Sequence, residues 1–319
     1  MAMREDPQLR ETLYCIRCGA CANSCANFQQ VGGHAFGGET YSGGIATGWE
    51  AGVHGYDSAA SFNDLCTGCS RCVNACPVNI DIPWINVVVR DRVNRGANAG
   101  ARTDWLVDGL RPEGDGRPSL RQRLFAHFET LARVGSATAP LSNWINCLLP
   151  VRALMEWAVG IDRRRALPPF SGETLRDWFA RRDRPERGAA PDRSVVLYPD
   201  VYTNYVHVDR GKAAVRTLEA LGAEVHIPDV PGSGRAPLSQ GMIARAERKA
   251  QGVWAALQAP VEEGQDVVVL EPTDLAMFQR RYDKLLPPEE AQALSDATVD
   301  LMEYVRRLLE EEEGAAQAL

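Results

Sequence analysis

Short hydrophobic runs alternate with longer amphipathic stretches over residues 191–319. The runs SVVLY (194–198), AEVHI (223–227) and DVVVL (266–270) have the length and the β-branched content of buried strands. Helical spacing predicts helices over residues 209–221, 239–258 and 274–284, and a last helix over residues 288–312. This alternation is typical of parallel strands joined by right-handed crossovers. We therefore predict an α/β domain with a parallel sheet over residues 191–319.

The middle of the chain, residues 101–190, is rich in arginine and proline and contains amphipathic helical pieces. In the stretch 141–161, Trp144, Leu149 and Trp157 fall at roughly helical spacing, which Pro150 interrupts. Such a stripe usually packs in a core, so we expect it to be buried, together with the thiol of Cys147. Docking of the stripe on a partner or on a membrane surface is the alternative.

Composition narrows the class of protein. The chain has 319 residues, of which 45% are hydrophobic and 24% charged, as in a globular protein of about two domains. It contains no uninterrupted apolar run of about 18 residues, the length that a membrane-spanning helix needs. No basic segment followed by an apolar one opens the sequence, so we expect a cytoplasmic protein in a reducing compartment. The net charge of −7 argues against non-specific affinity for nucleic acid or for anionic lipid.

Eight of the nine cysteines fall in two short runs of identical spacing. Each run reads C-x2-C-x2-C-x3-C, and Pro77 follows the second. Cysteines three residues apart bring three thiolates around one iron–sulfur cluster, and the fourth thiolate points toward the other cluster of a pair. We therefore predict two [4Fe–4S] clusters whose ligands cross over between the runs. The first cluster is assigned to Cys15, Cys18, Cys21 and Cys76, and the second to Cys66, Cys69, Cys72 and Cys25.

Two other uses of these cysteines fit the sequence less well. Disulfides are disfavoured in a reducing compartment, and the two runs occupy only the first third of the chain. Zinc sites use CxxC pairs but rarely four cysteines in one run of eleven residues. The first run departs from the usual pattern in one respect, because Ala26 stands where a proline normally follows the fourth cysteine.

The 40 residues between the runs are rich in glycine, which permits tight turns and close approach of backbone N–H groups to sulfide. A compact βαββαβ ferredoxin would need a shorter connection, so we predict a helical ferredoxin module. Its helices are expected around residues 9–25, 62–76 and 80–94. His34 and His54 lie in the connection and could be read as cluster or quinone ligands, but eight cysteines suffice, so we expect both to be structural or solvated.

The segments after the predicted strands are where an open α/β sheet would bind a ligand. They contain no cysteine, no histidine and no phosphate-binding glycine fingerprint, and PGSGR at residues 231–235 is a weak signal. Asp200, Glu271 and Asp274 could pair as acid and base, but acidic residues near helix starts are usually caps. We therefore predict no catalytic residue in this chain.

The stretch LYCIRCGACANSC…VGGHAFGG…DLCTGCSRCVNACPVNIDIPWI resembles the iron–sulfur protein of the lactate-utilisation operon. It is also similar to the ferredoxin modules in the C subunit of anaerobic glycerol-3-phosphate dehydrogenase and in the glycolate oxidase iron–sulfur subunit. The resemblance covers roughly residues 12–95 and, more weakly, residues 167–182. It implies cluster ligation by the eight cysteines already named. Members of the lactate-utilisation family usually carry a preceding LUD domain, which this sequence does not show, so we expect a split subunit or part of a longer protein.

The C-terminal part resembles the CCG domain of heterodisulfide reductase and of related electron-transfer proteins. That domain holds a further metal or cluster site on a CCG triplet and on a later cysteine. This sequence has Gly232, Ser233 and Gly234 in place of the triplet and Asp274 in place of the later cysteine. The resemblance therefore implies a degenerate domain, in which we expect no third cluster.

Together these features predict an α+β multidomain chain. We expect a helical two-cluster ferredoxin-like domain at residues 1–100, a helical connecting region at 101–190 and the degenerate α/β domain at 191–319. The predicted function is an electron-transfer subunit of a lactate-, glycolate- or glycerol-3-phosphate-type dehydrogenase. The implied partners are a flavoprotein dehydrogenase or LUD-domain subunit and a quinone or other carrier, with peripheral association to the cytoplasmic membrane left open. The alternatives are a structural or redox-sensing iron–sulfur protein and an autonomous enzyme acting through its C-terminal sheet.

Overall fold

The computed structural model describes residues 2–96, 110, 112–183 and 193–311. It divides the chain into two compact units, Met1–Ala126 with Ala236–Arg245, and His127–Arg235 with Ala246–Leu319. The sequence-based division at residues 100 and 190 stays a prediction. Parts of both predicted boundaries lie outside the described residues, and so does residue 312 of the last predicted helix.

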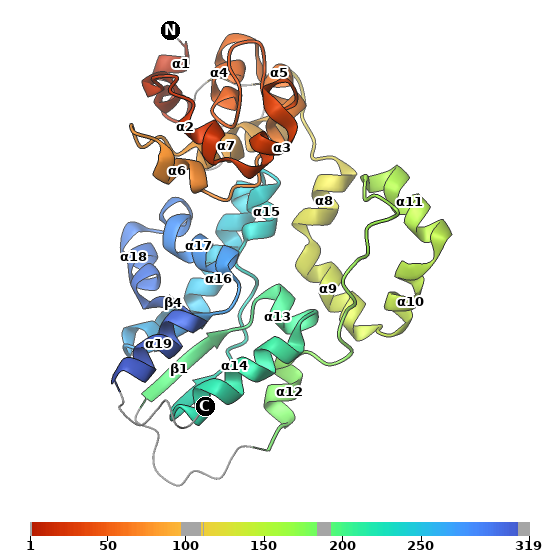
Figure 1. Cartoon of the computed structure of the whole chain (residues 1–319), viewed down its shortest axis with the longest axis vertical. Helices are drawn as coiled ribbons and strands as arrows, with labels where there is room; N and C mark the ends of the chain where they lie inside the picture. Colours follow the sequence, from red (N-terminus) through yellow and green to blue (C-terminus); the bar gives the residue numbers. More distant parts are fainter. Residues whose placement is uncertain (1, 97–109, 111, 184–192, 312–319) are drawn as a thin grey trace. The chain divides into compact units, whose positions relative to one another are not determined.

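The first unit is helical in its described residues (Figure 1), as predicted for the cluster module. Its elements are α1 (Ala2–Glu5), η1 (Arg10–Tyr14), α2 (Ala20–Ser24), α3 (Ala26–Ala35), α4 (Ala46–Val53), α5 (Tyr56–Asn63), α6 (Arg71–Ala75), α7 (Ile82–Arg95) and α8 (Leu120–Ala126). The predicted continuous helices over residues 9–25 and 62–76 are wrong. Both cysteine runs break the helix, because Arg17, Gly19, Gly68 and Ser70 have left-handed backbone angles.

Helix α7 is the centre of this unit. It begins after Asp81, whose side chain accepts a hydrogen bond from the backbone N–H of Trp84, and Pro83 fits its first turn. Apolar side chains on most of its sides are buried. Ile82, Ile85 and Val89 pack with Leu9 and with residues of α1, α4 and α5 in one core.

A buried ion pair fixes the start of the chain to α7. Arg92 is 2% exposed and its guanidinium binds both carboxylate oxygens of Asp6, while Nη1 lies 3.0 Å from the hydroxyl of Tyr56. Asp6 also accepts the N–H of Leu110. Because each charge is paired and hydrogen-bonded, the network is stable as a whole and costly to break on one side.

A distant segment, residues 236–245, belongs to the first unit as well. Asn94 of α7 donates to the carbonyl of Gln240 at 2.7 Å, and the N–H of Ile243 lies 3.3 Å from Oδ1 of Asp91. Gly241 has φ +67°, and a Cβ there would lie 2.4 Å from the Cβ of Arg90. Glycine is therefore required for this segment to close on α7.

The second unit contains a four-stranded parallel sheet of order β2-β1-β3-β4. Strands β1 (Arg193–Tyr198), β2 (Ala223–His226) and β3 (Asp266–Val269) confirm the three predicted strands and their parallel pairing. The fourth strand, β4 (Thr298–Asp300), pairs with β3 and was not predicted. The single helix expected over residues 288–312 is wrong, since β4 divides it into α18 (Pro288–Ala297) and α19 (Leu301–Glu311).

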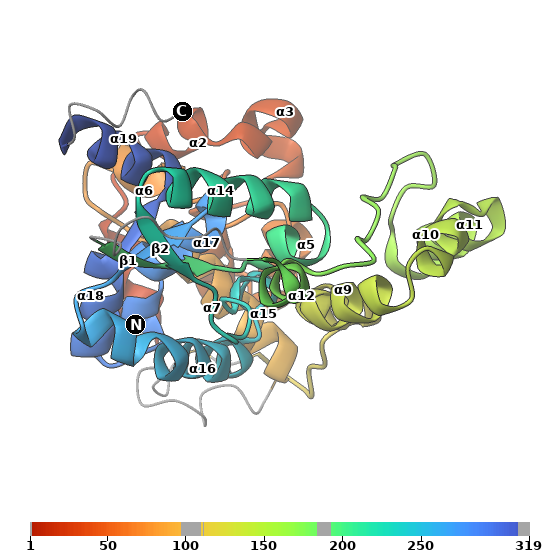
Figure 2. The ribbon, with the colours of Figure 1, turned by 90° about the horizontal axis from the view of Figure 1, so that it is seen from below.

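Helices cover both faces of this sheet, as Figure 2 shows for α14 on one side and α16 on the other. Helix α14 (Val208–Ala220) packs Val215 and Leu218, together with Leu308 of α19, against Val195 and Leu197 of β1. The remaining helical elements of the chain are α9 (Phe128–Ala137), α10 (Leu141–Cys147), α11 (Leu149–Val159), α12 (Leu175–Arg181), α13 (Val201–Tyr205), α15 (Arg235–Ser239), α16 (Ile243–Glu262), α17 (Pro272–Arg280) and η3 (Tyr282–Lys284). The predicted helices at 209–221, 239–258 and 274–284 correspond to α14, α16 and α17.

Helices α10 and α11 extend away from the sheet (Figure 2). The expectation that their apolar stripe is buried is wrong, because Trp144, Leu149 and Trp157 are 62%, 75% and 84% exposed. Cys147 is also exposed rather than buried. Pro150 starts a new helix instead of kinking one long helix, so the stripe lies on two short helices. No helix among the described residues has the length and apolar content to span a membrane.

Candidate metal centres

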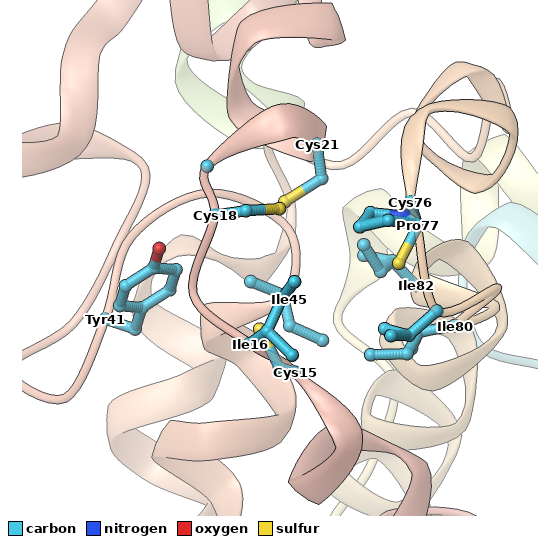
Figure 3. A pocket seen from close by; sticks show the side chains of 12 residues that line it. Cys15, Ile16, Cys18, Cys21, Tyr41, Ile45, Cys76, Pro77, Ile80 and Ile82 are labelled. Atoms are coloured by element: carbon cyan, nitrogen blue, oxygen red, sulfur yellow. The ribbon is translucent and has the colours of Figure 1, made fainter.

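The first candidate centre is a cavity of about 320 Å³, partly open to solvent, in the first unit. Cys15, Cys18 and Cys21 from the first run line it, and Cys76 from the second run faces them from another segment (Figure 3). The rest of the wall is mostly apolar and is formed by Ile16, Tyr41, Ile45, Pro77, Val78, Ile80 and Ile82, with Gly19. The structure therefore brings together the four cysteines that the sequence assigns to the first cluster.

The second candidate centre is a cavity of about 400 Å³ in the same unit. Cys66, Cys69 and Cys72 line it together with Cys25 of the first run, and Cys21 lines both cavities. As in the first cavity, three cysteines of one run meet the fourth cysteine of the other, but here Cys21 is a fifth cysteine in the lining. Because α2 and α6 contact each other, the two runs lie side by side.

The two runs have the same backbone path. In each run, the residues two and four positions after the first cysteine, Arg17 with Gly19 and Gly68 with Ser70, have positive φ angles between 57° and 76°. A short helix follows in each case. The fourth cysteine lies at the end of this helix and has an extended backbone conformation. The repeated turn curls the first three cysteines around one point and directs the fourth elsewhere. The N–H of Arg17 lies 3.4 Å from Sγ of Cys15, the kind of backbone contact that stabilises a thiolate.

Burial raises the pKa of three of these thiols, Cys21, Cys66 and Cys72, in the chain without metal. It raises the pKa of Cys21 to about 11 and that of Cys72 to about 12, opposed in Cys21 by the N–H of Ala22. Negative charge on neighbouring thiolates raises both pKa values further. The thiolates that act on Cys21 are Cys15, Cys76 and Cys18. Those that act on Cys72 are Cys66, Cys21, Cys69 and Cys25. Metal binding here must displace protons.

The donor set fits iron–sulfur clusters. Thiolates are soft ligands that favour iron–sulfur clusters, zinc and copper(I), and apolar walls such as those of the first cavity shield a cluster from water. Over the residues that the structure describes, no three His, Cys, Asp or Glu side chains converge closely enough to hold one ion. A cubane places its four ligands on separate iron corners and so spans more space than a single ion.

Neither histidine between the runs lines a cavity; both are at least partly open to solvent. Nδ1 of His54 lies 2.7 Å from the carboxylate of Glu50, which also accepts the N–H of Thr40 at 2.5 Å. Burial raises the pKa of Glu50, but these hydrogen bonds and one from Ser58 hold it below its ordinary value. The sequence analysis missed this buried carboxylate, because nothing in the local pattern marks Glu50 as buried.

At the carboxyl edge of the sheet, the structure brings together two residues that the CCG resemblance singled out. Ser233 Oγ donates to Oδ1 of Asp274 at 2.5 Å, and the hydroxyl of Tyr282 donates to the carbonyl of Ser233 at 2.9 Å. Burial raises the pKa of Asp274 to about 6, although Ser233 and Arg235 lower it. Asp200 caps α13 through the N–H groups of Tyr202 and Thr203, as expected for an acidic residue before a helix.

Residues 11–80 match the family described as the 4Fe-4S dicluster domain. All eight cysteines of the two cavities lie in this region, so the part of the chain that carries them is similar to the class of 4Fe-4S dicluster domains.

Curated relatives agree with this class. The chain is 29% identical to the C subunit of anaerobic glycerol-3-phosphate dehydrogenase of Escherichia coli K12, over 53% of the chain and 43% of that protein. It is 26% identical to lactate utilization protein B of Bacillus pumilus, over 55% of the chain and 35% of that protein. It is 28% identical to the electron transport protein YkgF of E. coli K12, over 56% of the chain and 35% of that protein.

The chain thus contains a region similar to a 4Fe-4S dicluster domain and is similar to these three proteins, as the sequence motifs predicted. The matches cover less than half of the length of each of these relatives. No solved structure matches the chain.

Proposed function

We propose that this chain relays single electrons between two [4Fe–4S] clusters. One observation carries the proposal: Cys21 lines both cavities, so the two centres share a wall. Two clusters held by these cysteines would be close enough to exchange electrons directly, without a carrier between them. No residue of the chain is assigned a catalytic role, so the organic chemistry belongs to a partner or to its cofactor.

The proposed ligands follow the crossed pattern. Cys15, Cys18, Cys21 and Cys76 hold the first cluster, and Cys66, Cys69, Cys72 and Cys25 hold the second. The cavity linings support this assignment, and so do the thiolates that act on Cys21 and on Cys72. The second unit is proposed to hold no third cluster, since Ser233 and Asp274 bind each other where the resembling domains have cysteines.

The proposed partner that supplies electrons is a flavoprotein dehydrogenase or a LUD-domain subunit, and the acceptor is a quinone or another carrier. The similarity to a glycerol-3-phosphate dehydrogenase subunit and to a lactate utilization protein supports a dehydrogenase of glycerol 3-phosphate or of a hydroxy acid such as lactate. The glycolate alternative rests on the sequence resemblance. Because the chain spans less than half of these relatives, the whole assembly is part of the proposal.

We also propose that the chain associates peripherally with the anionic surface of the cytoplasmic membrane through α10 and α11. Exposed Trp144 and Trp157 have the amphipathic rings that favour a membrane interface. Residues 141–165 contain four arginines and two acidic residues, a net charge of +2, whereas the whole chain carries −7. This local reversal of charge favours an anionic lipid surface over a second copy of this acidic chain.

Iron and acid-labile sulfide analysis of the full chain, prepared without oxygen, tests the relay. We expect about eight irons and eight sulfides per chain, with clusters that dithionite reduces and a quinone analogue reoxidises without loss of iron. Zinc in place of iron would contradict the proposal.

The same experiment separates the relay from a redox sensor or a structural cluster. A sensor loses its cluster on oxidation. A structural cluster is not reduced at the reduction potentials of its partners. Turnover of a hydroxy acid by this chain alone would favour an autonomous enzyme instead.

A further inference from the structure

Arg90 of α7 connects a cysteine loop to the distant segment 236–245 of the same unit. It is only 6% exposed, and its Nη2 donates to the carbonyl of Cys66 at 2.7 Å and also to that of Asn63. Its Nη1 donates to the carbonyl of Ser239 at 2.7 Å. The guanidinium is thus hydrogen-bonded to the backbone of Cys66, which the proposed function assigns to the second cluster.

Among the described residues, the charge on Arg90 is compensated only in part. The facing carboxylate, Asp64, lies 3.7 Å away and its side chain is 64% exposed, so water screens it. The next carboxylate on α7, Asp91, pairs with Arg95 instead. Because a guanidinium stays protonated, Arg90 places a permanent positive charge beside the second cavity.

The first cavity has a different arrangement. Its nearby arginine, Arg17, stacks over the rings of Trp49 and Tyr41 at 5.1 Å and 5.8 Å, but it is exposed to solvent. A charge in water acts weakly on a neighbouring centre, whereas a buried charge acts strongly. The two cavities therefore differ in their electrostatics although their cysteine loops have the same backbone path.

The segment 236–245 holds Arg90 in this position. Gly241 packs so closely on α7 that any side chain there would displace Arg90, and Asn94 fixes the neighbouring carbonyl of Gln240. The rotamer of Arg90 is therefore set by a segment some 150 residues later in the chain. No pattern near Arg90 in the sequence indicates this contact.

We propose that Arg90 is a positioning and electrostatic residue that raises the midpoint potential of the second cluster, and not that of the first. Reduction adds a negative charge to a cluster, and a buried cation beside its ligand loop stabilises that charge. Arg90 thus shifts the difference between the two potentials in the direction that favours reduction of the second cluster. This inference rests on the proposed two-cluster function.

Redox titration of the full chain followed by electron paramagnetic resonance tests the inference. The variants are Arg90→Gln and Arg90→Lys, and Cys69→Ala identifies the signal of the second cluster. In Arg90→Gln we expect the reduction equilibrium of the second cluster to weaken about tenfold, which is 59 mV for one electron, with the first cluster unchanged. Arg90→Lys keeps the charge but cannot reach both carbonyls, so we expect a smaller shift in the same direction.

Arg95→Gln is the matched control, because it removes an arginine of α7 that faces Asp91 rather than the cysteine loop. It should leave both potentials unchanged.

The inference is overturned if both clusters shift equally in an Arg90 variant, or if neither shifts. If Arg90→Gln does not retain the second cluster, Arg90→Met, which also removes the charge, decides: a fall confined to the second cluster supports the inference, and an unchanged potential contradicts it. Wild-type protein without eight irons would refute the proposed function itself, which is a separate result.

Discussion

The crossed assignment of ligands can be tested by pairing cysteine substitutions. Cys76 belongs to the second run in sequence, but it lines the first cavity with Cys15, Cys18 and Cys21. If it ligates the first cluster, then Cys15→Ala and Cys76→Ala damage the same cluster, and the double variant loses no more than that cluster. If it ligates the cluster of its own run, the double variant damages both.

The structure sets the expected iron content. Each cavity is lined by three cysteines of one run and the fourth cysteine of the other, so each cluster of four irons depends on both runs. We expect about eight irons in the wild type and about four in the variant Cys15→Ala/Cys76→Ala, with the second cluster intact. In the variant Cys66→Ala/Cys76→Ala we expect both clusters to be lost or incomplete.

Iron and sulfide analysis under anaerobic conditions, with electron paramagnetic resonance of the reduced protein, measures these contents. The control pair is Cys25→Ala with Cys66→Ala, which should spare the first cluster in the same way. The reasoning fails if Cys66→Ala/Cys76→Ala retains a complete cluster while Cys15→Ala/Cys76→Ala retains none, because each run would then hold its own cluster.

Three further predictions concern stability and surface binding. Because the raised pKa of Asp274, about 6, makes the folded chain hold a proton that the unfolded chain releases, stability should fall as pH rises from about 4 to about 6. Asp274→Asn should remove this pH dependence, which amounts to about 1.4 kcal/mol of unfolding free energy between about pH 5 and pH 8, measured by urea unfolding. If the free energy of unfolding of the variant depends on pH as steeply as that of the wild type, the prediction is wrong. Arg92→Met leaves Asp6 buried without its partner and should cost about 3–5 kcal/mol of unfolding free energy, more than the double replacement Asp6→Leu/Arg92→Met; equal losses in calorimetry would contradict the ion-pair argument. Replacing Trp144 and Trp157 by serine should lower cosedimentation with vesicles of about 30% phosphatidylglycerol at least tenfold, and wild-type chain that stays in the supernatant would exclude the proposed surface.

The sequence was sufficient for features that depend on local pattern. The three valine-rich strands were found because burial on both faces requires continuous apolar runs. The two cysteine sets were predicted because ligand spacing reflects the geometry of a cluster. Helix α7 was predicted from its apolar residues and from Pro83 in its first turn.

Other features were missed because long-range contacts determine them. Strand β4 has only three residues. The predicted helix is interrupted there because these residues pair with β3, and not because they have a high intrinsic preference for strands. The stripe on α10 and α11 has the periodicity of a core helix, yet nothing in the described chain covers Trp157. Periodicity indicates which face of a helix is apolar, but it does not indicate what that face meets.

The use of residues 236–245 by the first unit has a consequence for synthesis of the protein. A nascent chain emerges from the ribosome with its amino terminus first, and a domain made of one continuous stretch can fold as soon as that stretch is free. Here the hydrogen bond from Arg90 to Ser239 and the packing of Gly241 against Arg90 can form only after Ser239 and Gly241 have also emerged. Until the later segment arrives, the loop at Cys66 therefore lacks this support, and iron inserted earlier would meet a loop that is open on one side.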